Sequence, residues 1–202
     1  MLKDEAGSIA PAFLREGGEM SRLIAAFAWE RTSLGPIERW PQGIISTVAM
    51  ILRSPVPIVT LWGEDGVMIY NDAYSVFAGD RNAGLLGSGV REGWAEIADW
   101  NDHVMKVGLA GGTLSYRDQM LMLARRGVPE EVWLDLDYSP ITDAGGRPVG
   151  VIAIVVEITE RVRVQRRAAA LAELGEAIRQ TTDPEALAQA AGLILGRELQ
   201  VS

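Results

Sequence analysis

In residues 130–141 every second position from 132 to 138 is apolar, with Trp133, Asp135 and Asp137 between them, a pattern that constrains this part of the chain to a strand with one buried face. Its apolar members are Val132, Leu134, Leu136 and Tyr138. Successive side chains of a strand point to opposite faces, so these four lie on the same face. Turn residues follow at 142–148, and a second, more apolar strand is expected at 149–158. With a strand expected at 113–125, the three segments indicate an antiparallel meander.

The preceding half of the chain predicts a hairpin and several helices. Strands are expected at 58–62 and 67–71, because GEDG between them is a turn sequence. Apolar residues at helical spacing predict helices over 19–29, 41–54 and 94–112. The expected apolar face of the first helix is formed by Leu23, Ile24, Phe27 and Ala28. This order predicts an α+β fold with a five-stranded antiparallel sheet and helices on one face.

Composition excludes several kinds of function. The 202 residues have a formal net charge of −8, whereas nucleic-acid binding needs a basic surface. The absence of cysteine excludes disulfides, thiolate catalysis and cysteine-ligated metals. The N-terminus has no signal-peptide pattern, and no segment approaches the length of a membrane span. We therefore expect a cytoplasmic protein without a membrane span and without a nucleic-acid partner.

No enzyme motif is present in the sequence. The GxSxG, GxGxxG and GxxxxGK[ST] patterns are absent, and His103 is the only histidine. The paired acids Glu130 and Glu131 are typical of a solvated strand face. We expect no catalytic residue and no metal site in this chain.

Several stretches resemble a PAS domain, the sensory and dimerisation module of bacterial signalling proteins such as histidine kinases. The resemblance lies in LGPIERWP (34–41), WGEDGVMIYNDAY (62–74) and residues 125–161. The last of these ends in Glu-Ile-Thr-Glu-Arg (157–161), whereas the family usually has Asp-Ile-Thr-Glu-Arg. The resemblance implies a PAS fold.

The resemblance also implies a division of the chain. N-terminal flanking helices are expected in 1–55, the PAS core in 56–160, and a C-terminal linker or signalling helix from 161 to 202. Residues 171–202 are similar to the opening helix of a GAF domain.

The implied function is transmission of a signal. A ligand or partner changes the packing of the core, and the last strand passes the change to a C-terminal helix that regulates a downstream output domain. The expected transmission residues are Glu157, Thr159 and Arg161, with Thr159 capping the helix and Glu157 and Arg161 forming ion pairs. The output enzyme, expected to be a histidine kinase, would lie outside this sequence. The alternatives are a constitutive dimerisation scaffold without a ligand and a haem- or flavin-binding sensor.

A sheet that curls around helices can enclose a small-molecule pocket, although the same residues could simply fill a core. The candidate lining residues are Met68, Tyr70, Phe77, Leu86, Trp94, Ile97, Met105, Met120, Met122, Leu134 and Tyr138. Some PAS domains bind haem through a histidine on the long helix, but the position of His103 predicts a ring that faces away from the pocket. Light-sensing members use a cysteine at the place of residues 79–87, and no cysteine is present. Adduct photochemistry is therefore excluded. Non-covalent flavin binding is not excluded, but no residue calls for it, and we expect neither haem nor non-covalent flavin.

The segment after the last strand has a heptad pattern. Apolar a and d positions are filled by Val164, Leu171, Leu174 and Ile178, with Arg167 at one d position. This predicts a homodimer that forms through flanking helices. Helix 19–29 could contribute its own apolar face to this dimer, or pack on its own sheet.

Overall fold

The computed structural model describes residues 11–15, 18–180 and 192. The chain divides into two units, Met1–Glu157 and Ile158–Ser202. Of the predicted GAF-like segment, 171–202, the described residues are 171–180 and 192; a further helix that the sequence predicts from Asp183 and Pro184 onward lies outside the described residues except at 192.

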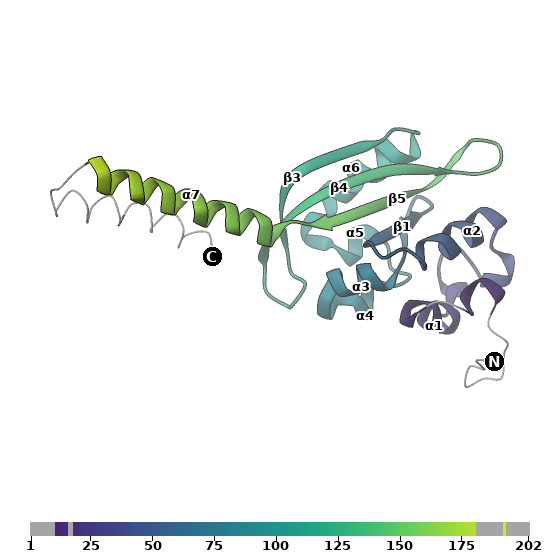
Figure 1. Cartoon of the computed structure of the whole chain (residues 1–202). Coiled ribbons are helices and arrows are strands. Elements are labelled where there is room, and N and C mark those ends of the chain that lie inside the picture. The colour runs from purple at the N-terminus through teal and green to yellow at the C-terminus, as the bar shows by residue number, and fades with distance from the viewer. Residues whose placement is uncertain (1–10, 16–17, 181–191, 193–202) are drawn as a thin grey trace. The chain divides into compact units, whose positions relative to one another are not determined.

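The first unit contains the sheet and most helices (Figure 1). The strands are β1 (Ile58–Trp62), β2 (Val67–Tyr70), β3 (Leu114–Leu123), β4 (Glu130–Thr142) and β5 (Pro148–Glu157). The α-helices are α1 (Glu19–Ala26), α2 (Gln42–Ile51), α3 (Asp72–Ala78), α4 (Asn82–Leu85), α5 (Val90–Gly93) and α6 (Ala98–Leu109). Short 3-10 helices are η1 (Ala12–Leu14), η2 (Trp29–Arg31), η3 (Ile37–Arg39), η4 (Gly79–Arg81) and η5 (Ala95–Ile97).

The five strands form one antiparallel sheet with the order β2-β1-β5-β4-β3. The predicted α+β fold and the five-stranded sheet are confirmed. The alternation predicted for β4 is also confirmed, because Val132, Leu134, Leu136 and Tyr138 are buried while the residues between them are not. These four side chains are the contribution of β4 to the inner face of the sheet, on which α6 packs.

β3 contains a bulge that shifts its register by one residue. Tyr116 pairs with Leu136, but the next described pair is Gln119 with Leu134, so β3 has one residue more than its partner. Asp118 occupies this position with φ +50°, a left-handed conformation that is uncommon outside glycine. Because successive side chains of a strand alternate between its two faces, the extra residue moves each later side chain of β3 to the opposite face.

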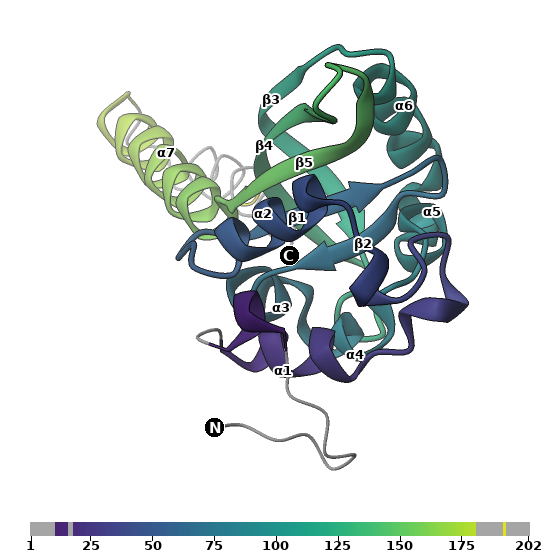
Figure 2. The same ribbon diagram turned by 90° about the vertical axis from the view of Figure 1, so that its right-hand side faces the viewer.

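The N-terminal helices pack on the first unit itself. Helix α2 contacts β1 and β2, on the face opposite the inner face (Figure 2). Helix α1 ends three residues earlier than predicted, and its buried residues are Met20, Ser21 and Ile24. The expected face was therefore wrong in part, because Leu23 is 41% exposed. The Met20 N–H donates to Asp72 Oδ1 at 2.8 Å, which ties α1 to the start of α3.

Asn71 joins the elements around the first hairpin. Its side chain is fully buried and its Oδ1 accepts from the N–H groups of Ile58 and Tyr74, at 3.1 and 2.9 Å. Its Nδ2 donates to the carbonyls of Ile51, Ser54 and Val56. Asn71 is thus the N-cap of α3. This one amide fixes the start of α3, the helix that carries Tyr74 and Phe77.

The second unit contains α7 (Thr159–Gln180). Its described heptad residues present apolar side chains to solvent: Val164 is 55% exposed, Leu171 70% and Ile178 56%. Leu174 is half-buried. No helix in the described ranges is both long and apolar enough to cross a membrane.

Candidate functional site

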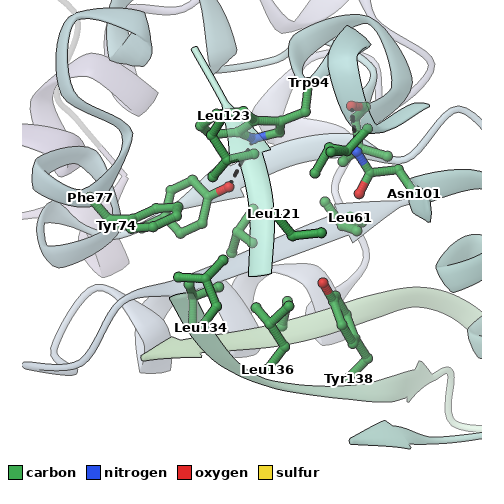
Figure 3. A pocket seen from close by; sticks show the side chains of 15 residues that line it. Leu61, Tyr74, Phe77, Trp94, Asn101, Leu121, Leu123, Leu134, Leu136 and Tyr138 are labelled. Atoms are coloured by element: carbon green, nitrogen blue, oxygen red, sulfur yellow. Dashed lines mark hydrogen bonds between the residues drawn. The ribbon is translucent and has the colours of Figure 1, made fainter. Parts of the chain in front are cut away.

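A small cavity of about 40 Å³ lies between the inner face of the sheet and the helices α3, α5 and α6 (Figure 3). Its lining residues are Val59, Leu61, Tyr74, Phe77, Val90, Trp94, Ile97, Asn101, Leu121, Leu123, Leu134, Leu136, Tyr138, Ala153 and Val155. Most are aliphatic or aromatic, and none carries a charge. This is the composition of a site for an apolar or neutral group.

Two tyrosine–tryptophan pairs supply polar atoms at the cavity. The Tyr74 hydroxyl accepts from the Trp94 indole N–H at 3.0 Å, and the Tyr138 hydroxyl accepts from the Trp100 indole N–H at 3.2 Å. Burial raises the pKa of Tyr138 to about 12, and it raises the pKa of Tyr74 further. Both hydroxyls are therefore neutral in ordinary buffers.

Asn101 adds an amide to the cavity wall from helix α6. The residue is only 5% exposed, and its Nδ2 lies 3.4 Å from the carbonyl oxygen of Val90. In Figure 3 the Asn101 amide oxygen and the Tyr138 hydroxyl are both directed toward the space between them. The cavity therefore combines an apolar lining with three neutral polar groups.

The structure places some of the expected lining residues at the cavity and others elsewhere. Those at the cavity are Phe77, Trp94, Ile97, Leu134 and Tyr138. Those not in its lining are Met68, Tyr70, Leu86, Met105, Met120 and Met122.

Four of the residues outside the lining belong to neighbouring parts of the core. Strand β2 is buried on both faces, and the Tyr70 hydroxyl donates to the Asn82 carbonyl at 2.8 Å. Met68 donates its backbone N–H to the Ser88 carbonyl. Leu86 is half-buried beside the same core, and Met105 lies next to the Gly66 turn.

Met120 and Met122 lie on the opposite face of the sheet, 37% and 44% exposed. The bulge at Asp118 explains this correction, because the extra residue turns Leu121 and Leu123 inward in their place. Tyr74 and Asn101 were not expected at the site. The spacing of Tyr74 to Phe77 on one helix could have identified the first, but no local pattern marks Asn101.

His103 is exposed on α6 and does not line the cavity. Within the described part of the chain, no three His, Cys, Asp or Glu side chains are grouped to hold a metal ion.

A buried arginine links the cavity wall to the end of β5. Arg125 is 8% exposed and donates to Glu130 Oε1 at 2.9 Å and to Glu157 Oε2 at 2.6 Å. It also donates to the Phe77 carbonyl at 3.2 Å, and its guanidinium lies 5.1 Å from the Phe77 ring centroid. We call these four residues the Arg125 cluster.

The electrostatics of this cluster favour a permanently charged arginine. Burial alone would lower the pKa of Arg125, but the bonds to Glu157 and Glu130 outweigh it and raise the pKa. Glu157 therefore forms an ion pair with Arg125, a partner that the sequence did not predict. Thr159 is the first residue of α7, and Arg161 lies within that helix.

Comparison with known proteins identifies the family to which the chain is similar. A family model described as PAS fold matches residues 53–163. No curated protein matches the chain significantly. The PAS domain of Bordetella pertussis BvgS is 21% identical, over 66% of this chain and 98% of that chain, with a TM-score of 0.48.

Two further solved structures are similar. A Rhodobacter sphaeroides LOV protein is 18% identical, over 80% of this chain and 98% of that chain, with a TM-score of 0.48. A sensory box sensor histidine kinase from Vibrio cholerae is 14% identical, over 61% of this chain and 100% of that chain, with a TM-score of 0.41.

Proposed function

The chain belongs to the PAS-fold family, and from this premise we propose that it is a sensory module whose cavity controls helix α7 through strand β5. Occupation of the cavity, or binding of a partner, changes the packing on the inner face. The change reaches α7 through Glu157 and Thr159 and regulates a downstream output domain, which we propose to be a histidine kinase. The Arg125 cluster is the observation that carries this proposal.

The first step of the proposed path is at Phe77. Its side chain lines the cavity, while its carbonyl accepts from Arg125 and its ring lies beside the guanidinium. A ligand that displaces Phe77 therefore also changes the contacts of Arg125. Since interiors are closely packed, a small displacement at the wall is passed to neighbouring groups rather than absorbed.

The second step is at Glu157, the last residue of β5 and two positions before the start of α7. Its carboxylate has two contacts with Arg125, at 2.6 and 3.3 Å. Strand β5 is also central in the sheet, and its residues Ala153 and Val155 line the cavity. A change in the cavity can thus act on the end of β5 by two routes.

The third step is pairing of α7 with the same helix of a second copy. The exposed heptad residues Val164, Leu171 and Ile178 support a homodimer, because a row of large apolar side chains gains from being covered. Helix α1 is less suited to this role, since Met20 and Ile24 are buried within its own unit.

Cross-linking tests the pairing and the transmission together. The sequence contains no cysteine, so Leu171→Cys introduces a single thiol at an a position and Ala169→Cys introduces one at the opposite f position. We expect oxidation to cross-link the first variant and not the second. Arg125→Met in the Leu171→Cys background should change the extent of cross-linking, and equal cross-linking with and without Arg125 would contradict the transmission path.

The small volume of the cavity favours one alternative, a constitutive dimerisation scaffold without a ligand. A scaffold predicts that Leu171→Cys cross-links and that changes at the cavity leave the cross-linking unaltered. A haem or flavin sensor is not supported by the geometry. A cavity of about 40 Å³ has no room for either ring system, and His103 is exposed on α6.

A further inference from the structure

The two cavity tyrosines have hydrogen-bonding capacity that no described residue uses. Each hydroxyl oxygen accepts an indole N–H, from Trp94 to Tyr74 and from Trp100 to Tyr138. A hydroxyl that accepts in this way still has its own hydrogen to donate. Within the described residues neither hydrogen has an acceptor, so both donors are available to a group in the cavity.

Asn101 presents an acceptor to the same space. Its Nδ2 faces the Val90 carbonyl, and the reversed amide would place two oxygens against each other, so the oxygen must face the cavity. The hydrogen bonds of Asn101 to the described residues involve Nδ2 alone. The Asn101 amide oxygen borders the cavity and is therefore open to a hydrogen-bond donor that enters it.

The absence of charge in the lining determines the charge of that partner. None of the fifteen lining residues is ionisable except the two tyrosines, which stay neutral. A carboxylate or ammonium group would enter without a counter-charge, and burial of an unpaired charge is strongly unfavourable. The geometry therefore favours a neutral group with both an acceptor and a donor.

We propose that the cavity takes the end of a small neutral compound that carries a carbonyl group beside an N–H or O–H, of which a primary carboxamide is the simplest. The carbonyl oxygen accepts from Tyr74 and Tyr138, and the N–H or O–H donates to Asn101. This inference rests on the proposed sensing function of the cavity. The volume of about 40 Å³ is roughly a quarter of an apolar cavity that admits benzene, so the recognised group has few heavy atoms.

Three isosteric probes test the chemistry on the unaltered chain. Acetamide has the carbonyl and the donor, acetone lacks the donor, and acetate carries a charge. The indole N–H signals of Trp94 and Trp100 in a nitrogen-15 NMR spectrum report on the cavity, because both donate to the tyrosine hydroxyls. Trp29, Trp40, Trp62 and Trp133 serve as internal controls.

We expect acetamide to shift the Trp94 and Trp100 signals in a saturable way at millimolar concentration, since so few atoms give limited affinity. Acetone should bind about three- to tenfold more weakly, and acetate should give no saturable shift. Equal shifts for all three probes, or saturation by acetate, would overturn the proposal.

Variants locate the contacts. Tyr138→Phe and Asn101→Leu should each weaken acetamide binding about three- to tenfold. Tyr70→Phe also removes a buried hydroxyl but lies outside the cavity, so it should leave acetamide binding unchanged. If a variant fails to fold, the comparison of probes on the unaltered chain still decides the question.

The result is separable from the proposed function. Selective binding of acetamide that leaves the cross-linking of Leu171→Cys unchanged would refute transmission to α7 and support the ligand class. Loss of selectivity among the probes, with cross-linking that still depends on Arg125, would refute the ligand class and support transmission.

Discussion

Replacement of Arg125 by methionine should destabilise the first unit by about 3 kcal/mol. Methionine keeps much of the apolar stem of the side chain but removes the charge and the four hydrogen bonds to Glu130, Phe77 and Glu157. Hydrogen bonds to charged groups contribute about 1.5–3 kcal/mol each, which is the upper limit for each contact. The stabilisation lost at the carboxylates is smaller, because the side chains of Glu130 and Glu157 are 25% and 35% exposed and water can solvate them.

The carbonyl of Phe77 accounts for much of the remainder. Its bond to Arg125 is buried, and a buried acceptor that loses its donor costs about 1–3 kcal/mol. The contact between the guanidinium and the Phe77 ring is lost as well, at about 0.5–1 kcal/mol. Together with a discounted contribution from the carboxylates, these losses give about 3 kcal/mol.

Urea and thermal unfolding of the full chain measure this effect. For a protein of this size, 3 kcal/mol corresponds to a fall in Tm of about 6–12 °C. Arg126→Met is the matched control. The Arg126 side chain is 73% exposed, and its ion pair with Glu130 is long, at 3.9 Å, so this substitution should change the free energy of unfolding by less than about 1 kcal/mol. A double-mutant cycle of Arg125→Met with Glu157→Gln should give a coupling of about 1 kcal/mol.

Equal losses for Arg125→Met and Arg126→Met would refute the reasoning, because they would show that burial and the contact with Phe77 contribute nothing. A coupling of zero between Arg125 and Glu157 would remove the link between the cavity wall and the end of β5.

Three further predictions concern stability and pH. Burial opposes ionisation of Glu96, but the hydrogen bonds from the Ala124 N–H and Arg81 outweigh it and hold the pKa of Glu96 below 4.5. The stability that ionised Glu96 contributes should therefore be lost as the pH falls through the folded-state pKa, and Glu96→Gln should reduce that loss in acid unfolding curves. The pKa of Tyr138 is raised from 10.0 to about 12, so stability should fall as the pH rises between these values, and Tyr138→Phe should flatten that fall in alkaline unfolding measurements. Asn71→Asp should destabilise the chain by about 3 kcal/mol or more in urea, because a carboxylate cannot donate to the three carbonyls that Asn71 binds; an unchanged midpoint would contradict this account.

Regular periodicity made much of the fold predictable. The alternation in β4 identified four inward positions correctly, because that strand has no irregularity along them. The same alternation gave wrong inward positions in β3, because a strict period of two does not reveal an extra residue. Met120 and Met122 were expected inside, and the left-handed conformation of Asp118 put Leu121 and Leu123 there instead.

The polar part of the site was less predictable, for two reasons. Asn101 has polar neighbours in the sequence, which favour a solvent-exposed position on the helix. Its burial becomes evident only from the tertiary fold. Arg125 is separated from Glu157 by 32 residues and from Phe77 by 48, so no local pattern relates them. In contrast, Phe77 and Trp94 were predictable, because large aromatic side chains next to expected strands are usually buried.

The bulge in β3 also affects how copies of the chain can associate. β3 is an edge strand, and an edge presents backbone N–H and C=O groups that can extend the sheet into another molecule. An extra residue in a left-handed conformation interrupts the regular spacing of those groups, so a partner strand could pair with only part of this edge. The bulge therefore acts against aggregation by strand addition at this edge of the sheet.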